Sequence, residues 1–172
     1  MTTRTLKPLP LTSERFAPYG DVIMTGGGRK PMNEARFTHY GDLATVDVDS
    51  AGDVAISSVR SRIPTSLPHA VDRVERHPLG SQAFIPLLEF SFIIVVGPPG
   101  ESVDPDGLKA FVTNSRQGVN YHRGTWHMPL LALEEGQQFL VVDRTPHHDN
   151  CETHVFDEPL IVERYGQDVN GR

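Results

Sequence analysis

Turn-forming residues interrupt this chain too often for it to contain long helices. Its 172 residues include 15 glycines and 14 prolines, about one residue in six, whereas about 12% is typical of soluble proteins. Proline fixes φ and lacks a backbone N–H, and glycine accepts a positive φ, so both residue types favour turns. Clusters such as Gly97-Pro98-Pro99-Gly100 and Asp104-Pro105-Asp106-Gly107 therefore predict a domain of short strands joined by tight turns.

The segments between these turns have the length and composition of β-strands. Each is rich in Val, Ile, Phe or Leu, and none has a helical period over about ten residues or more. The expected strands are Leu43–Val48, Val54–Arg60, Gln82–Leu87, Ser91–Val96, Leu108–Thr113, Met128–Leu133, Gln138–Asp143 and Cys151–Phe156. No repeat or long linker divides the chain, so we predict a single all-β domain over residues 1–172, built as a sandwich or barrel. Only short helices fit, one between Thr12 and Pro18 and one over Pro159–Tyr165.

The charge, cysteine content and hydrophobicity of the chain limit the kinds of binding partner and the cell compartment that we expect. The chain carries 16 Lys and Arg against 22 Asp and Glu, a formal charge of −6, which repels phosphate backbones and argues against nucleic acid. A single cysteine, Cys151, cannot build a disulfide framework, so we expect a cytoplasmic protein with this thiol buried as a small apolar group. The most apolar stretch, Ala83–Val96, contains Pro86 and Glu89 and is shorter than the ~20 residues of a membrane-spanning helix. No membrane partner and no signal peptide are expected.

His77 and His127 are the candidate reactive histidines, because each lies at the edge of an expected strand beside other polar residues. Side chains alternate along a strand, so Glu75 and His77 share one face, and a turn at Gly124 brings His127 to the start of the next strand. Two such strand ends facing each other across a small barrel would form one polar site in an apolar interior. Imidazole titrates near neutral pH and is the commonest metal ligand, so acid–base and metal chemistry both stay open.

The same residues resemble the two motifs of the cupins. Gly124 and His127 match the glycine and histidine of the second motif. Glu75, His77 and Gln82 follow the spacing of the first motif, with Glu in place of its first His and Gln in place of its Glu. A neutral amide is a poorer ligand for a divalent cation than a carboxylate. The resemblance therefore implies a weak metal site with Glu75, His77, Gln82 and His127 as its ligands.

The chain also resembles the ureidoglycolate lyase family, whose members are also called ureidoglycolate hydrolases, along nearly its whole length. The segments that carry this resemblance are Leu9–Leu11, Gly20–Ile23, Glu75–Pro86, Ala110–Asn114, Gln117–Arg123, Trp126–His127, Asp143–Arg144 and Asp149–Cys151. Gln82, which departs from the general cupin motif, fits the pattern of this family. The resemblance implies a cupin-like β-barrel (double-stranded β-helix) that forms a homodimer and acts in allantoin catabolism, a part of purine metabolism.

The activity that this resemblance implies is cleavage of (S)-ureidoglycolate to glyoxylate and urea by a carbon–nitrogen lyase. The reaction needs a base for the substrate hydroxyl proton and an acid for the departing nitrogen. His77 and His127 are expected to be this base and acid, or to ligate a divalent metal that polarises the hydroxyl. The family is associated with nickel, which imidazole suits, and the sequence leaves open whether any metal is needed.

The other polar residues of these motifs are expected to contact the substrate. Arg123 and Arg144 are the candidates for holding its carboxylate, because a guanidinium binds a carboxylate through two hydrogen bonds. The resemblance also makes Tyr121 a candidate donor to a developing oxyanion, although an aromatic residue here belongs more often to the barrel core or the dimer interface. The residues expected to contact the urea amide groups are Gln82, Asn120 and Asp143.

Two other functions stay open from the sequence. A different metal-dependent cupin enzyme, such as an oxygenase or isomerase, would hold stoichiometric iron, manganese or zinc, which Glu75 and Gln82 disfavour. A non-catalytic barrel that binds a small molecule as a sensor would lose only affinity when His77 or His127 is replaced. All three functions predict a small-molecule ligand.

Overall fold

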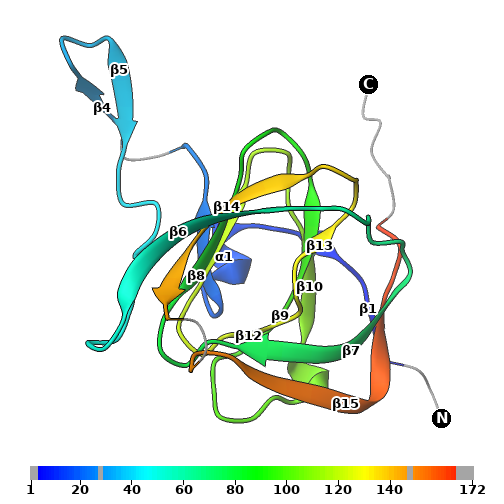
Figure 1. Ribbon diagram of the computed structural model, residues 1–172. Helices are drawn as coiled ribbons and strands as arrows, with labels where there is room; N and C mark the ends of the chain where they lie inside the picture. Colours follow the sequence, from blue (N-terminus) through cyan, green and yellow to red (C-terminus); the bar gives the residue numbers. More distant parts are fainter. Residues whose placement is uncertain (1–3, 27–28, 147–148, 166–172) are drawn as a thin grey trace, which may run out of the picture.

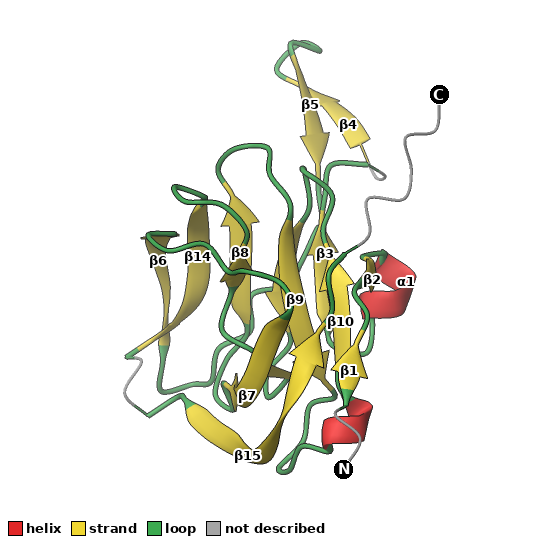
Figure 2. Ribbon diagram, turned by 90° about the vertical axis from the view of Figure 1, so that its right-hand side faces the viewer, coloured by secondary structure: helices red, strands yellow, loops and turns green. Residues whose placement is uncertain are grey.

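Two β-sheets that face each other form the body of the protein, and a separate hairpin protrudes from it (Figure 1, Figure 2). The computed structural model describes residues 4–26, 29–146 and 149–165. Two curled sheets and two short helical segments confirm the predicted all-β, cupin-like barrel with peripheral helices. Within these described ranges, no helix is long and apolar enough to cross a membrane.

The larger sheet has eight strands and the smaller sheet has five. In the order in which neighbours pair, the larger sheet contains β1 (Thr5–Leu6), β15 (Glu152–Val162), β7 (His69–Arg76), β12 (Trp126–His127), β9 (Phe92–Gly97), β10 (Lys109–Val112) and β2 (Leu9–Pro10), and β13 (Leu131–Ala132) also pairs with β9. The smaller sheet contains, in order, β3 (Gly20–Ile23), β11 (Gly118–Tyr121), β8 (Gln82–Pro86), β14 (Gln138–Thr145) and β6 (Asp53–Arg60). The protruding hairpin consists of β4 (Arg29–Met32) and β5 (Phe37–Tyr40).

The expected helix after Thr12 is present as α1 (Ser13–Phe16), and a 3₁₀ turn, η1, covers Pro105–Gly107. Thr12 is the N-cap of α1, because its hydroxyl oxygen accepts a hydrogen bond from the backbone N–H of Arg15 at 3.2 Å. Phe16 is completely buried and packs edge-on against Phe111 of β10. The helix therefore closes one side of the space between the sheets.

β9 lies inside the larger sheet and is buried on both faces. Phe92, Ile94 and Val96 face the smaller sheet and form an inter-sheet core with residues such as Tyr121 and Phe139. The alternate residues of β9 face the opposite way, into a second apolar cluster formed within the curled larger sheet. Residues that share the register of Val96 therefore point into the space between the two sheets.

Three sequence predictions of secondary structure are wrong or incomplete. Pro159–Tyr165, expected as a helix, instead contains the last four residues of β15, because Leu160 and Val162 are buried and pair with β7, and residues 163–165 are in neither a helix nor a strand. Leu43–Val48, expected as a strand, is a loop whose one β-bridge joins Val48 to Gly80. Of Met128–Leu133, only the two residues of β13 are in a strand.

β7 is a strand that the sequence pattern did not predict. Its buried valines, Val71 and Val74, are three residues apart, whereas regular alternation requires two. Its partner β15 shifts register between Val155 and Leu160, which is the signature of a β-bulge. The spacing of the two buried valines conceals the alternation on which strand prediction depends, and β7 carries Glu75 to the interior.

Candidate active site

Strand register brings a group of polar side chains to one place between the sheets. Glu75 of β7 is the cross-strand partner of His127 in β12, and His127 is in turn the partner of Val96. On the facing sheet, Tyr121 of β11 is the partner of Gln82 in β8. Directly opposed residues in antiparallel strands point to the same face. These polar side chains therefore line the inter-sheet space at the end of the apolar core.

His77 and His127 both face the carboxylate of Glu75. The Nε2 atom of His127 lies 3.6 Å from Oε1 of Glu75, and the Nε2 atom of His77 lies 4.0 Å from the same oxygen. The two imidazole ring centroids are 5.2 Å apart. His127 is fully buried, whereas Glu75 and His77 are partly buried. The convergence predicted for His77 and His127 is therefore present in the structure.

Hydrogen bonds at Nδ1 fix the protonation pattern of both rings. The Nδ1 atom of His77 lies 2.5 Å from the carbonyl oxygen of Asn150, and that of His127 lies 2.9 Å from the carbonyl oxygen of Thr125. A carbonyl oxygen can only accept, so each Nδ1 carries a hydrogen, and in the neutral form of each ring Nε2 then holds the lone pair. Both Nε2 atoms are buried and lack a hydrogen-bond partner among the described residues. Two lone pairs and a carboxylate oxygen thus converge with no donor between them.

A glycine turn delivers His127 to this position. Gly124 has a φ of +75°, which L-residues with a side chain rarely adopt, and its N–H donates to the carbonyl oxygen of His77 at 2.9 Å. The next residue, Thr125, donates its hydroxyl to the carbonyl oxygen of Tyr19 at 2.8 Å. The turn therefore ties the backbone beside one site histidine to the backbone of the other.

The environment shifts the pKa values of the cluster in opposing ways. The neighbouring imidazole of His127 is the main reason that the pKa of Glu75 lies below its usual value, against the effect of burial. Burial is the main reason that the pKa of His77 is lowered. Burial also raises the pKa of Tyr121 far above the value of a free phenol. Near neutral pH, Glu75 is therefore ionised, His77 is neutral and Tyr121 is protonated.

The donor set fits a divalent metal ion. The ligand atoms of Glu75, His77 and His127 all lie within 4.8 Å of one another. One carboxylate oxygen and two neutral imidazole nitrogens with free lone pairs suit first-row divalent metals, including nickel. Gln82, the fourth expected ligand, donates its amide N–H to Asp143 at 3.4 Å, and its Oε1 is buried with no hydrogen-bond partner among the described residues.

A cleft of about 340 Å³ opens beside the cluster. It reaches Glu75 and Gln82, and the other residues that line it are Val59, Arg60, Ser61, Ile63, Thr65, Phe84, Pro129, Leu130, Ala132 and Phe139. Sequence reasoning missed the polar residues of this wall, above all Arg60, which ends the predicted strand Val54–Arg60. A cation at the last position of an expected strand was the available signal. No ion pair involves Arg60 among the described residues.

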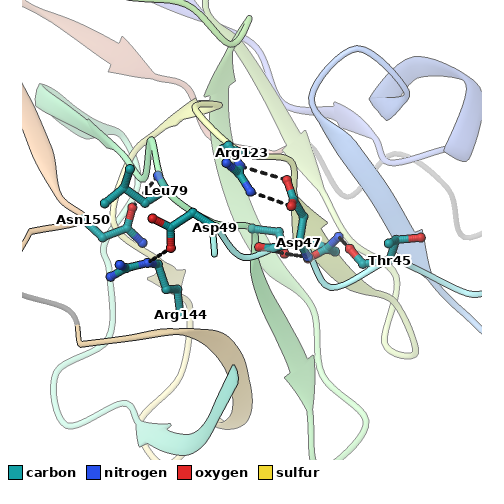
Figure 3. Close-up of polar contacts among 9 residues, drawn as sticks. Thr45, Asp47, Asp49, Leu79, Arg123, Arg144 and Asn150 are labelled. Atoms are coloured by element: carbon teal, nitrogen blue, oxygen red, sulfur yellow. Dashed lines mark hydrogen bonds and ion pairs between the residues drawn. The ribbon is translucent and has the colours of Figure 1, made fainter. Parts of the chain in front are cut away.

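The structure places both predicted carboxylate-binding arginines outside the cluster, each beside an aspartate (Figure 3). Arg123 binds Asp47 through two hydrogen bonds of 2.6 and 2.9 Å. Arg144 is buried and donates to Asp49 at 2.7 Å, which is the main reason that the pKa of Asp49 is lowered. Both aspartates belong to the loop between β5 and β6, so the two ion pairs fasten this loop to the barrel.

Asn120 also lies on the outer side of its strand. Its amide N–H groups donate to Asp21 at 3.0 Å and to the carbonyl oxygen of Thr45 at 3.1 Å. Asp143, in contrast, contacts Gln82 and belongs to the inter-sheet face. Cys151, expected to be buried, is exposed, and its Sγ lies 3.7 Å from Oε2 of Glu75. The site thus unites Glu75, His77, Gln82, Tyr121, His127 and Asp143, without Asn120, Arg123 or Arg144.

Comparison with known proteins identifies the family to which the chain belongs. The family model described as ureidoglycolate lyase matches residues 3–163. Ureidoglycolate lyases are 50% identical over 163 residues in Pseudomonas aeruginosa (93% of this chain, 96% of the relative) and 49% identical over 162 residues in Pseudomonas fluorescens (92% and 97%). A solved dTDP sugar isomerase from Desulfovibrio desulfuricans covers 88% of both chains at 18% identity, but its TM-score of 0.38 is too low to support an argument. From the family match and these relatives, the chain belongs to the ureidoglycolate lyase family.

Proposed function

We propose that this protein cleaves (S)-ureidoglycolate to glyoxylate and urea at the cluster of Glu75, His77 and His127, with a bound divalent metal ion. One observation carries this proposal: two imidazole lone pairs and a carboxylate oxygen converge on one point without a donor among the described residues. The family assignment supplies the substrate. Nickel is the metal we expect, because neutral imidazoles suit it.

The substrate carries a hydroxyl group and a urea nitrogen on the same carbon. In the reaction, the hydroxyl loses its proton and its oxygen forms the carbonyl of glyoxylate. The carbon–nitrogen bond then breaks with its electron pair on nitrogen, and that nitrogen takes up a proton to give urea. The reaction therefore needs one proton acceptor and one proton donor and consumes no further reactant.

The residues of the cluster suit particular roles in this reaction. A metal ion held by Glu75, His77 and His127 would lower the pKa of the substrate hydroxyl and hold its oxygen. His77 is neutral because its pKa is lowered, so it suits the role of ligand or base better than that of acid. Tyr121 stays protonated and suits donation to the developing oxyanion. Gln82 and Asp143 are in place to bind the urea amide groups through hydrogen bonds.

For the substrate carboxylate, the geometry supports Arg60 over the two arginines expected from the sequence. Arg60 is the one arginine that lines the cleft, among the described residues, and it is exposed there. Arg123 and Arg144 are already neutralised by Asp47 and Asp49. The interior cluster itself contains the carboxyl groups of Glu75 and Asp143, which repel an anion. A cation at the rim and a metal ion inside would together orient an anionic substrate.

The proposal extends to the setting of the enzyme. Cleavage of ureidoglycolate belongs to the breakdown of allantoin, and the single cysteine suits a reducing cytoplasm. A homodimer is supported by β6, an edge strand of the smaller sheet that exposes Val54 by 52% and Ile56 by 70%. Light scattering of the purified protein tests the dimer, and a monomer at micromolar concentration would contradict it.

The deciding experiment measures glyoxylate and urea released from racemic ureidoglycolate by the purified protein. We expect turnover that disappears with EDTA and returns on addition of nickel, with half of the racemate consumed. Turnover that resists chelation would overturn the metal and leave His77 and His127 as direct base and acid. No turnover in any condition would overturn the lyase and favour a different cupin enzyme or a binding barrel.

A further inference from the structure

We propose that Asn150 is a positioning residue that fixes the ring orientation and tautomer of His77. The inference rests on the proposed function, because it assumes that the Nε2 atom of His77 works in the cluster with Glu75 and His127. Nothing in the sequence motif around His77 identifies its partner. The partner lies 73 residues away in the chain.

Asn150 binds both ends of the turn that carries His77. Its carbonyl oxygen accepts the Nδ1–H of His77 at 2.5 Å, and its side-chain Oδ1 accepts the backbone N–H of Leu79 at 2.7 Å. The residue between them, Pro78, has no N–H to donate. Asn150 is only 4% exposed, so water competes little for these bonds. One buried residue therefore holds the turn of residues 77–79 by accepting two hydrogen bonds from it.

The side chain of Asn150 is needed to hold the backbone carbonyl group of this residue in place, because Asn150 lies outside the hydrogen-bonded strands. The first register pair of β15 joins Glu152 to Arg76, so Asn150 lies two residues before the ladder. The bond from Oδ1 to the N–H of Leu79 places residue 150 against the turn instead. Figure 3 shows Asn150 beside Leu79, with the ion pair of Asp49 and Arg144 next to them.

Leu79 is a firm anchor for this contact. Its carbonyl oxygen accepts the N–H of Asp49 at 2.9 Å, and the carboxylate of Asp49 binds Arg144 at 2.7 Å. Arg144 also donates to the carbonyl oxygen of Pro146 at 2.7 Å, so Pro146 belongs to the same network. The arginine expected to bind substrate thus supports the turn from outside the barrel.

The two site histidines depend on different kinds of contact. The acceptor for His127 is the carbonyl oxygen of Thr125, two residues earlier in the same segment. The acceptor for His77 exists only when the segment at Asn150 docks on the turn. Loss of the docking contact should therefore disturb His77 and leave His127 unchanged. Outer-shell partners of this kind typically change metal affinity by about 10- to 100-fold.

The test variant is Asn150→Ala, which removes the acceptor for Leu79. Asn150→Asp keeps an oxygen at that position and should restore the contact. The matched control is Gln117→Ala, because Gln117 is 5% exposed and its Oε1 accepts a backbone N–H from Asn114, away from the cluster. Asn150→Ala loses one side-chain hydrogen bond to the backbone, and Gln117→Ala loses two, because Nε2 of Gln117 also donates to the carbonyl oxygen of Leu11 at 3.2 Å. We therefore expect the control to lose at least as much thermal stability as Asn150→Ala.

Two readouts distinguish positioning from a merely structural role. The first is the affinity for nickel alone, measured by competition with a chromogenic chelator well below the melting temperature. The second is the tautomer of His77 in the metal-free protein, read from the ¹⁵N shifts of its ring. We expect Asn150→Ala to bind nickel about 10- to 100-fold more weakly and to lose the pure Nδ1–H tautomer. Asn150→Asp should recover most of both, and Gln117→Ala should change neither.

Each outcome decides the inference. Wild-type nickel affinity and a wild-type His77 tautomer in folded Asn150→Ala would overturn it, whatever the melting temperature. If Asn150→Ala does not fold, Asn150→Ser makes the same test with a shorter acceptor side chain. If the unaltered protein binds no nickel, the metal part of the proposed function fails, and the ring tautomer alone still tests the role of Asn150.

Discussion

Tyr121 lies almost parallel to His127, with ring centroids 4.3 Å apart and ring planes at 17°. Tyr121 is fully buried, and its hydroxyl has no hydrogen-bond partner among the described residues. A buried hydroxyl without a partner costs about 1–3 kcal/mol of stability. The stacked pair therefore places a protonated donor beside a site histidine at a cost to stability, which is typical of a functional residue.

Replacement of Tyr121 by phenylalanine should lower kcat without lowering stability. Tyr121→Phe keeps the stacked ring and removes only the unpartnered hydroxyl, so we expect an equal or higher melting temperature. Loss of one oxyanion donor typically lowers kcat by about 10²- to 10³-fold. Steady-state kinetics and calorimetry measure both effects. Tyr19→Phe, a buried tyrosine of the same core, is the control, and equal kcat in the two variants would remove Tyr121 from the reaction.

Replacement of Glu75 by glutamine should abolish metal binding while preserving the fold. Glu75→Gln is close in shape but lacks the charge that faces the Nε2 atoms of His77 and His127. We expect the affinity for nickel to fall by more than the ~100-fold that outer-shell losses produce, with turnover lost in parallel. Isothermal titration with nickel measures this. Glu158→Gln, on an exposed part of β15, should bind nickel normally, and normal binding by Glu75→Gln would contradict the proposed ligand set.

Replacement of Arg60 by alanine should raise KM and leave kcat nearly unchanged. A hydrogen bond to a charged group contributes about 1.5–3 kcal/mol, which corresponds to a rise in KM of about 10- to 100-fold. Arg123→Ala is the control, because its exposed ion pair with Asp47 contributes at most about 1 kcal/mol. The reverse pattern, with KM raised only in Arg123→Ala, would return the carboxylate to the residue expected from the sequence.

Stability should fall as pH drops below the ordinary pKa of histidine, and His77 should contribute to the fall. The pKa of His77 is lowered in the folded state from 6.5, so between that pH and the lower native value the unfolded chain binds more protons. The free energy of unfolding must therefore decrease as pH decreases through this range. Glu75, whose pKa is also lowered, contributes above its unfolded value of 4.5 and loses that contribution only at lower pH.

Urea unfolding of the metal-free protein from pH 7.5 to 5 measures this slope. We expect a smaller slope in His77→Gln, which cannot take up the proton, and an unchanged slope in His39→Gln, where the imidazole lies on the exposed strand β5. An unchanged slope in His77→Gln would show that the native pKa of His77 is not lowered.

The local sequence pattern was sufficient to predict secondary structure where the environment of a residue follows from its neighbours in the chain. The apolar run Ser91–Val96 predicts the strand β9, and Thr12 before a short helix predicts the N-cap of α1. The pattern failed where a distant partner decides the outcome. Leu160 and Val162 extend β15 because β7 lies beside them, and β7 itself lacks a regular alternation of buried residues.

In the site, strand alternation separates candidates that are adjacent in the sequence. Side chains alternate along a strand, so only one residue of Asn120 and Tyr121, and one of Asp143 and Arg144, can face the interior. The sequence named all four and did not say which. The sheet register decides, since Tyr121 is opposite Gln82 and Asp143 shares that face, while the other two point outward.

The sequence by itself determined the chemistry available to this protein, because residue types and their spacing fix which side chains can ligate, titrate or donate. It identified His77, His127, Glu75 and Gln82, and it placed the turn at Gly124. The tertiary structure alone decided which lone pairs face inward, because the partners that fix the rings, such as Asn150, come from distant segments. It also revealed Arg60 at the cleft, since a cleft exists only after the sheets have packed.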